Sequence, residues 1–75
     1  MAQIELKPLE VIEDEIAAPV NADMVLEDLA IDSLEYICML RRLEETFSIR
    51  IEEEDLKDVK TIGDLCGLVN RMRSA

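Results

Sequence analysis

Apolar residues at the spacing of an α-helix are the feature that most constrains how this 75-residue chain folds. They recur every three or four residues in two main runs, and each run follows a possible helix cap with an acidic residue three positions later. Asp32 and Glu35 take these places before the first run, and Thr61 and Asp64 before the second. Only two glycines and two prolines punctuate the chain. The pattern predicts an all-α fold.

We expect a four-helix bundle with a long first loop and a short third helix, in a single domain over residues 1–75. The first helix is predicted to begin between Glu5 and Pro8, because proline is tolerated in a first turn, and to end at Pro19. A loop from about residue 18 to residue 31 follows it. A short third helix is expected around residues 53–59, where acidic residues occupy the first turn.

The residues expected to face the core recur at helical spacing within these helices. They are Leu9, Ile12, Ile16, Tyr36, Met39, Leu40, Leu43, Phe47, Leu56, Val59, Ile62, Leu65, Cys66, Val69 and Met72. The first loop is too apolar to lie free in water, so we expect part of it to pack over the helices. The residues concerned are Met24, Val25, Leu26 and Leu29.

Composition excludes several classes of function. With 18 acidic and 8 basic residues the net charge is −10, which repels nucleic acids and anionic membranes. The chain has no histidine for a nucleophilic pair, and Cys38 and Cys66 alone cannot complete a four-ligand zinc site. No apolar run approaches the roughly 18 residues of a membrane span. We expect a soluble, cytoplasmic monomer with no bound metal, in which both cysteines are buried and reduced.

Ser33 is the candidate functional residue. As the first residue of the second helix, it places a hydroxyl beside unpaired backbone amides and the positive end of the helix dipole. This environment favours an anion attached to the serine oxygen, such as a phosphodiester. Asp32 and Glu35 cannot replace a histidine as general base. The position therefore predicts an attachment point and not a nucleophile that acts by itself.

The segment "EDLAIDSLEYICMLRRLEETF" resembles the modification segment of the acyl carrier proteins, in which an Asp-Ser-Leu tripeptide carries 4'-phosphopantetheine on the serine. The resemblance implies that a phosphopantetheinyl transferase transfers the group from coenzyme A to Ser33, with Asp32 and Leu34 recognised by that enzyme. The arm's thiol would then hold acyl groups as thioesters for partners in fatty acid, polyketide or related biosynthesis. The protein would carry acyl groups without being an enzyme.

The resemblance also suggests two sets of contact residues. An acyl chain would be sheltered where an aliphatic core opens between helices. The expected lining residues are Tyr36, Met39, Leu43 and Leu56. Acyl-transferring or ketosynthase-type partners with basic docking patches would contact the second helix. The expected partner-binding residues are Glu35, Ile37, Arg41 and Glu44.

The chain departs from the family pattern at a few positions, which indicates a specialised, discrete carrier. Ala30 stands where a glycine is usual, and Cys38 and Arg41, with Arg42 beside Arg41, stand where an acidic and then an apolar exposed residue are usual. We hypothesise that Arg41 and Arg42 meet an acidic spot on a partner. Two alternatives are an unmodified acidic helical adaptor and an aminoacyl or peptidyl carrier, although "LAIDSL" lacks the two glycines typical of the latter.

Overall fold

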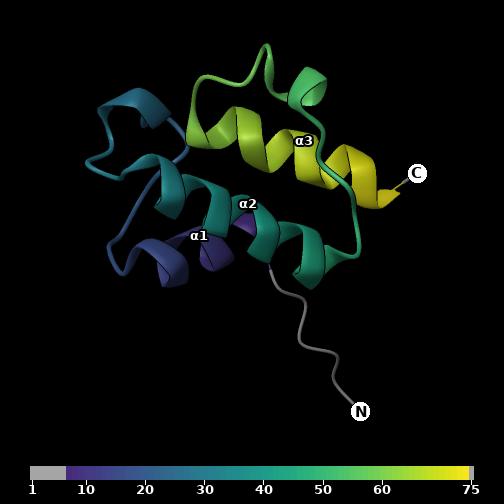
Figure 1. Ribbon diagram of the computed structural model, residues 1–75, viewed down its shortest axis with the longest axis horizontal. Coiled ribbons are helices and arrows are strands. Elements are labelled where there is room, and N and C mark those ends of the chain that lie inside the picture. The colour runs from purple at the N-terminus through teal and green to yellow at the C-terminus, as the bar shows by residue number, and fades with distance from the viewer. Residues whose placement is uncertain (1–6, 75) are drawn as a thin grey trace.

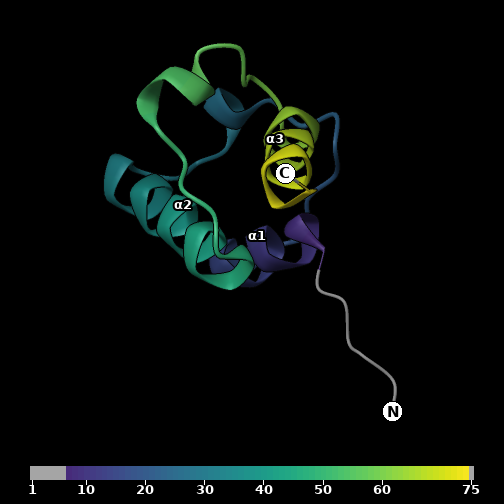
Figure 2. The same cartoon turned by 90° about the vertical axis from the view of Figure 1, so that its right-hand side faces the viewer.

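The computed structural model describes residues 7–74, except for the side chain of Ser74. These residues form three α-helices, α1 (Pro8–Ile16), α2 (Ser33–Phe47) and α3 (Ile62–Ser74). Two short 3₁₀ helices, η1 (Leu26–Asp28) and η2 (Glu53–Leu56), lie in the connections (Figure 1). The three α-helices surround one core, as the view along α3 shows (Figure 2). The all-α prediction is confirmed.

The predicted four-helix count is not confirmed. Residues 53–59 contain the four-residue 3₁₀ helix η2 in place of an α-helix. Glu52 and Asp55 form a capping box, in which the Glu52 amide donates to Asp55 Oδ2 at 3.0 Å. Leu56 and Val59 are partly buried against the core, as expected. Because i→i+3 hydrogen bonds have poorer geometry, such a turn stays short.

Helix α1 begins at Pro8, which is within the predicted range, while Glu5 lies outside the described residues. It ends at Ile16, three residues before Pro19, because Ala17 adopts a left-handed conformation with φ 61°. The amide of Ala17 donates to the Glu13 carbonyl at 2.8 Å and closes the last turn.

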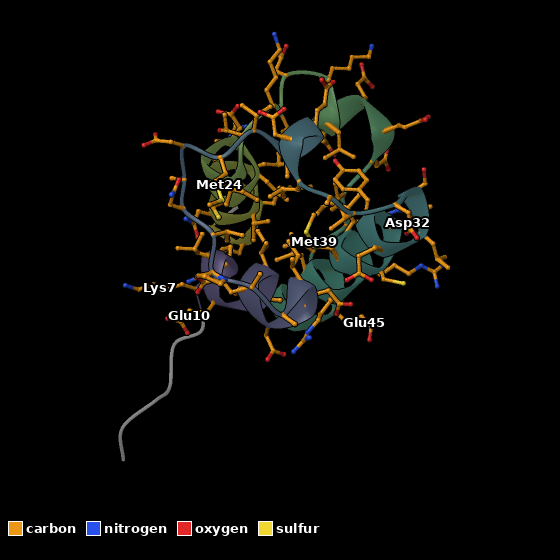
Figure 3. All side chains as sticks on the ribbon, turned by 90° about the vertical axis from the view of Figure 1, so that its left-hand side faces the viewer. Lys7, Glu10, Met24, Asp32, Met39 and Glu45 are labelled. Atoms are coloured by element: carbon orange, nitrogen blue, oxygen red, sulfur yellow. The ribbon has the colours of Figure 1, made fainter. Side chains whose placement is uncertain are left out.

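Among the residues that the structure describes, the core is aliphatic and consists of nine buried hydrophobic residues from all three helices and the first loop. They are Val11, Ile12, Val20, Met39, Leu43, Ile62, Leu65, Leu68 and Val69. Met39 points between the helices, whereas Glu45 on the same helix points outward (Figure 3). Tyr36, Leu40 and Phe47 of α2 are partly buried against this core. The predicted apolar face of α2 is therefore confirmed.

The first loop is held against the segment before α3. Val25 and Thr61 form an isolated antiparallel bridge, flanked by donation from the Leu26 amide to the Lys60 carbonyl at 2.8 Å. The Ile62 amide donates to the Met24 carbonyl at 2.9 Å. Met24, Leu26 and Leu29 pack on the core as predicted, but Val25 is exposed because this bridge turns it outward.

The two cysteines are free thiols in different environments. Cys66 is partly buried, and burial raises the pKa of its thiol. The prediction that Cys38 is buried was wrong, because α2 turns it to the exposed face. Among residues 7–74, no helix is long and apolar enough to cross a membrane.

Candidate functional site

The start of α2 is an exposed helix N-terminus capped by Asp32. The Glu35 amide donates to Asp32 Oδ1 at 2.8 Å, and the Tyr36 amide donates to the Asp32 carbonyl at 3.0 Å. No return bond from the Asp32 amide to the Glu35 carboxylate is found in the described part of the chain, so only half of the predicted capping box forms. Ser33 is the first helical residue and is exposed to solvent.

From residue 18 onward, the loop before Ser33 reaches the helix without a left-handed residue. Within residues 7–74 the non-glycine residues with positive φ are Ala17, which caps the end of α1, and Ser48, which caps the end of α2. The Ile31 amide donates to the Leu29 carbonyl at 2.8 Å, which turns the chain immediately before the cap. Ala30 therefore occupies its position without requiring the freedom of a glycine.

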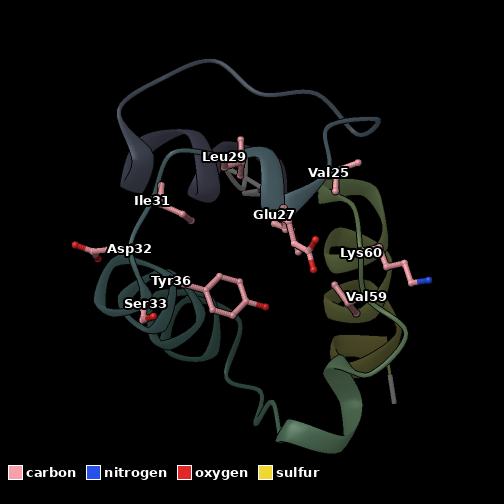
Figure 4. Close-up of a pocket in the computed structure, with 10 residues that line it drawn as sticks. Val25, Glu27, Leu29, Ile31, Asp32, Ser33, Tyr36, Val59 and Lys60 are labelled. Atoms are coloured by element: carbon pink, nitrogen blue, oxygen red, sulfur yellow. The ribbon is translucent and has the colours of Figure 1, made fainter.

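A cavity of about 590 Å³ adjoins Ser33 (Figure 4). Its volume lies within the roughly 300–1,000 Å³ typical of small-molecule sites. Its walls come from the first loop, the start of α2 and the segment before α3. The lining residues are Val25, Leu26, Glu27, Leu29, Ile31, Asp32, Ser33, Tyr36, Val59 and Lys60. Because Ser33 both lines the cavity and is exposed, the cavity opens to solvent beside the serine.

Tyr36 reaches into the cavity from α2, one turn after Ser33. Its ring and hydroxyl point toward the opposite wall, while the Lys60 amine and the Asp32 carboxylate point away from the cavity (Figure 4). Partial burial raises the pKa of the Tyr36 phenol, so the phenol is neutral at pH 7. Its hydroxyl makes no hydrogen bond with any other residue in the described range 7–74.

The structure separates the residues that were expected to line an acyl pocket. Tyr36 lines the cavity, Met39 and Leu43 are fully buried in the core, and Leu56 is partly buried beside it. Sequence reasoning missed most of the wall that lies opposite α2. The missed residues are Val25, Leu26, Glu27, Leu29, Ile31, Val59 and Lys60. The sequence feature that could have indicated this wall is the excess of apolar residues in the first loop.

The outer face of α2 exposes an apolar and basic stripe, which we define as Leu34, Ile37, Cys38 and Arg41. Leu34 is 69% exposed and Ile37 is 51% exposed, which is unusual for large aliphatic residues. The four positions follow i, i+3, i+4 and i+7, so they share one face of the helix. Arg41 is exposed and has no ion pair within the described residues.

Two charged residues near this stripe have structural partners. Arg42 donates to Asp14 and, at 3.2 Å, to Glu15 Oε1, and so joins α2 to α1. The hydrogen bonds to Asp14 and then Glu15 raise the pKa of the Arg42 guanidinium. Glu44 accepts a hydrogen bond from the Ile51 amide at 2.8 Å and holds the chain that leaves α2. Glu35 is partly buried.

Comparison with known proteins gives a consistent result. Residues 9–69 match the family model described as phosphopantetheine attachment site. The chain is 35% identical over 83 aligned positions to the anthracycline acyl carrier protein DpsG of Streptomyces peucetius, covering 100% of this chain and 99% of the relative. It is 32% identical over 66 positions to an acyl carrier protein of Kineococcus radiotolerans, covering 83% and 82% of the two chains.

The fold matches a solved structure of the same kind. The solution NMR structure of a holo acyl carrier protein from Geobacter metallireducens superposes with a TM-score of 0.76, at 20% identity, over 88% of this chain and 80% of the other. The unmodified adaptor, an alternative raised by the sequence, is not favoured by these relatives. This chain belongs to the acyl carrier proteins, which are carriers with covalently attached 4'-phosphopantetheine and not enzymes.

Proposed function

We propose that Ser33 is the residue that carries 4'-phosphopantetheine. The observation that supports this most strongly is its place as the exposed first residue of α2, at the mouth of the cavity. A phosphodiester there would lie at the positive end of a 15-residue helix. Ser48 is a poor alternative, because it ends α2, where the helix dipole disfavours negative charge.

The transfer itself would depend on a separate enzyme. A bond would form between Ser33 Oγ and phosphorus as the bond to the nucleotide part of coenzyme A breaks, and the hydroxyl proton would pass to the transferase. Asp32 holds the helix start and points away from the cavity, where an incoming enzyme can meet it (Figure 4). Leu34, at 69% exposure, offers an apolar contact to the same enzyme. Once attached, the group supplies a thiol that carries acyl groups as thioesters.

Intact-mass measurement tests this assignment. The native chain, Ser33→Ala and Ser48→Gly would each be incubated with coenzyme A, magnesium and a broad-specificity phosphopantetheinyl transferase. We expect one added phosphopantetheine on the native chain and on Ser48→Gly, and none on Ser33→Ala. Glycine suits the left-handed φ of 53° at position 48, so this control keeps the fold. Modification of Ser33→Ala would contradict the proposal.

We further propose that the cavity is the entrance through which an acyl chain reaches shelter. Tyr36 lines it, and Met39 and Leu43 lie in the core to which α2 contributes. Leu56 packs against that core from η2. Flexible Met and Leu side chains repack at low cost, which supports a core that opens around a chain.

Partner enzymes would dock on the outer face of α2. The net charge of −10 favours encounter with basic patches. Ile37 and Arg41 are exposed and available for contact, and Glu35 on the same helix is partly buried. Glu44 would shape this surface by holding Ile51 more than by direct contact.

Of the two arginines, Arg41 is the one left to meet an acidic group, because Arg42 is paired with Asp14 and Glu15.

Separate arginine variants test this division of roles. Arg41→Ala should weaken acyl transfer to the cognate enzyme without changing the melting temperature. Arg42→Ala should lower the melting temperature and leave transfer of the folded protein nearly unchanged. Equal effects of the two variants on transfer would contradict the proposed roles.

We propose a pathway of the polyketide type for this carrier, because its relative DpsG of Streptomyces peucetius is an anthracycline acyl carrier protein. Ketosynthase-type and other acyl-transferring enzymes would then be its partners, with fatty acid biosynthesis as the second candidate pathway. We propose that it acts as a cytoplasmic monomer, with residues 1–75 forming one carrier domain.

A further inference from the structure

The Tyr36 hydroxyl is directed into a cavity that aliphatic and polar residues line together. The aliphatic lining residues are Val25, Leu26, Leu29, Ile31 and Val59, and the other polar or charged ones are Glu27, Asp32, Ser33 and Lys60. Figure 4 shows the Tyr36 ring crossing toward the wall opposite α2, with the Glu27 side chain reaching into the same space. Within residues 7–74 no protein atom accepts from or donates to this hydroxyl. Its hydrogen-bonding capacity is therefore available to a ligand.

The chemistry of an occupant decides whether this capacity is used. A saturated chain in the cavity would cover the hydroxyl and remove water from it without supplying a partner, which is unfavourable for a polar group. A chain with a carbonyl oxygen would accept a hydrogen bond from the neutral phenol. A chain with a hydroxyl could in addition donate to the Glu27 carboxylate. The same aliphatic walls would pack against the rest of either chain.

We propose that Tyr36 makes this cavity selective for acyl chains that carry a carbonyl or hydroxyl oxygen over saturated chains of equal length. The proposal rests on the function proposed above, since the chain must be attached beside the cavity. It names the substrate class: partly reduced or unreduced acyl intermediates are sheltered, and a fully reduced chain is held less well. A site built around a hydrogen bond discriminates against a ligand that lacks the matching group.

The test uses chains of one length on the native protein and on Tyr36→Phe, which lacks only the hydroxyl. Octanoyl-, 3-oxooctanoyl- and 5-oxooctanoyl-coenzyme A would be used with a broad-specificity transferase to load each chain in one step, with loading verified by intact mass. On the native protein we expect at least one oxo form to melt about 4 °C or more above the octanoyl form. On Tyr36→Phe we expect this difference to disappear.

Tyrosine fluorescence provides a second measurement that needs no variant. The chain has one tyrosine and no tryptophan, so its emission reports on Tyr36 alone. We expect emission to change between the bare arm and an oxo-acyl arm. Unchanged emission for every chain, or a native protein that melts no higher with either oxo chain than with octanoyl, would overturn the proposal. A native protein that gains no mass would instead overturn Ser33 attachment, so the two failures are distinguishable.

Discussion

The starts of α2 and α3 use the same capping chemistry for different purposes. At α3, Thr61 Oγ1 accepts from the Asp64 amide at 3.0 Å, and Asp64 Oδ2 accepts from the Thr61 and Lys60 amides at 3.1 Å each. The next residue, Ile62, is fully buried. At α2, Asp32 makes only half of such a box. The residues that follow it, Ser33 and Leu34, are exposed.

The difference shows that the residues after a cap determine whether a helix start packs against the protein or stays open to another group. At α3, isoleucine and Gly63 bring the helix against the first loop, where the Gly63 amide donates to the Ala22 carbonyl at 2.9 Å. The protein itself satisfies the donors there. At α2, serine and leucine leave the helix start open beside a cavity. The first arrangement stabilises the fold, and the second leaves a site for another group.

The largest expected effect is on the free energy of unfolding. It should differ between a buried leucine near the start of α3 and an exposed leucine near the start of α2. Leu65→Ala removes a fully buried side chain of α3 and should lower the free energy of unfolding by about 2–5 kcal/mol. Leu34→Ala should change it by less than about 0.5 kcal/mol, because Leu34 is exposed. Urea denaturation followed by circular dichroism measures both. A comparable loss in Leu34→Ala would show that the start of α2 also supports the fold.

The two caps offer a matched pair with a smaller expected effect. Thr61→Ala and Asp32→Ala should each lower the free energy of unfolding by about 1 kcal/mol, the usual value of an N-cap. Only Asp32→Ala should also slow phosphopantetheine transfer, which timed intact-mass measurements would follow. The proposed separation of roles fails if Thr61→Ala, measured well below its melting temperature, slows transfer as much.

The two glycines of α3 differ in how closely they approach the first loop. A Cβ at Gly67 meets open space, so Gly67→Ala should stabilise the protein by about 0.5–1 kcal/mol. A Cβ at Gly63 would lie 3.0 Å from the Ala22 carbonyl oxygen, which is a backbone atom. Gly63→Ala should therefore stabilise less than Gly67→Ala or destabilise, as judged from thermal melting. Equal gains at both positions would mean that the contact with Ala22 is loose.

The smallest expected effect is the contribution of Asp64 to the loss of stability in acid. Hydrogen bonds from the Lys60 and then the Thr61 amide hold the pKa of Asp64 below its ordinary value of 3.8. The unfolded chain then binds more protons than the folded chain in this range, so the Asp64 contribution is present above about pH 4 and is lost as the pH falls through the lower folded pKa. In Asp64→Asn the melting temperature should fall less steeply below pH 4. Identical pH profiles would contradict this contribution.

Local signals in the sequence predicted the caps and the apolar faces well. The caps at Asp32 and Thr61 depend on residues within one helical turn, and the structure has both. The cavity could not be predicted, because it depends on the bridge between Val25 and Thr61, residues far apart in the chain. The same bridge explains why Val25 is exposed. The α-helix expected near residue 53 is a 3₁₀ turn, because the local sequence pattern does not distinguish a short α-helix from a 3₁₀ helix.

Other details depended on contacts between helices. Arg41 and Arg42 are adjacent in sequence and suggest one shared role, but in the structure Asp14 and Glu15 of α1 pair with Arg42. Glu44 is predicted from the sequence to be a surface carboxylate that contacts a partner. In the structure it accepts a hydrogen bond from the Ile51 amide, on the chain that follows α2. Cys38 falls between buried Met39 and exposed Ile37 on the helix, so its exposure depended on where the packing face ends.

Tandem mass spectrometry of proteolytic peptides from the native, transferase-treated protein would locate the attached group directly. The three serines of the chain are at positions 33, 48 and 74, and digestion at arginine separates them. If the open start of α2 is the site, the phosphopantetheine mass will be found on the peptide that contains Ser33 and on no other. Its presence on the Ser48 or Ser74 peptide would contradict the account.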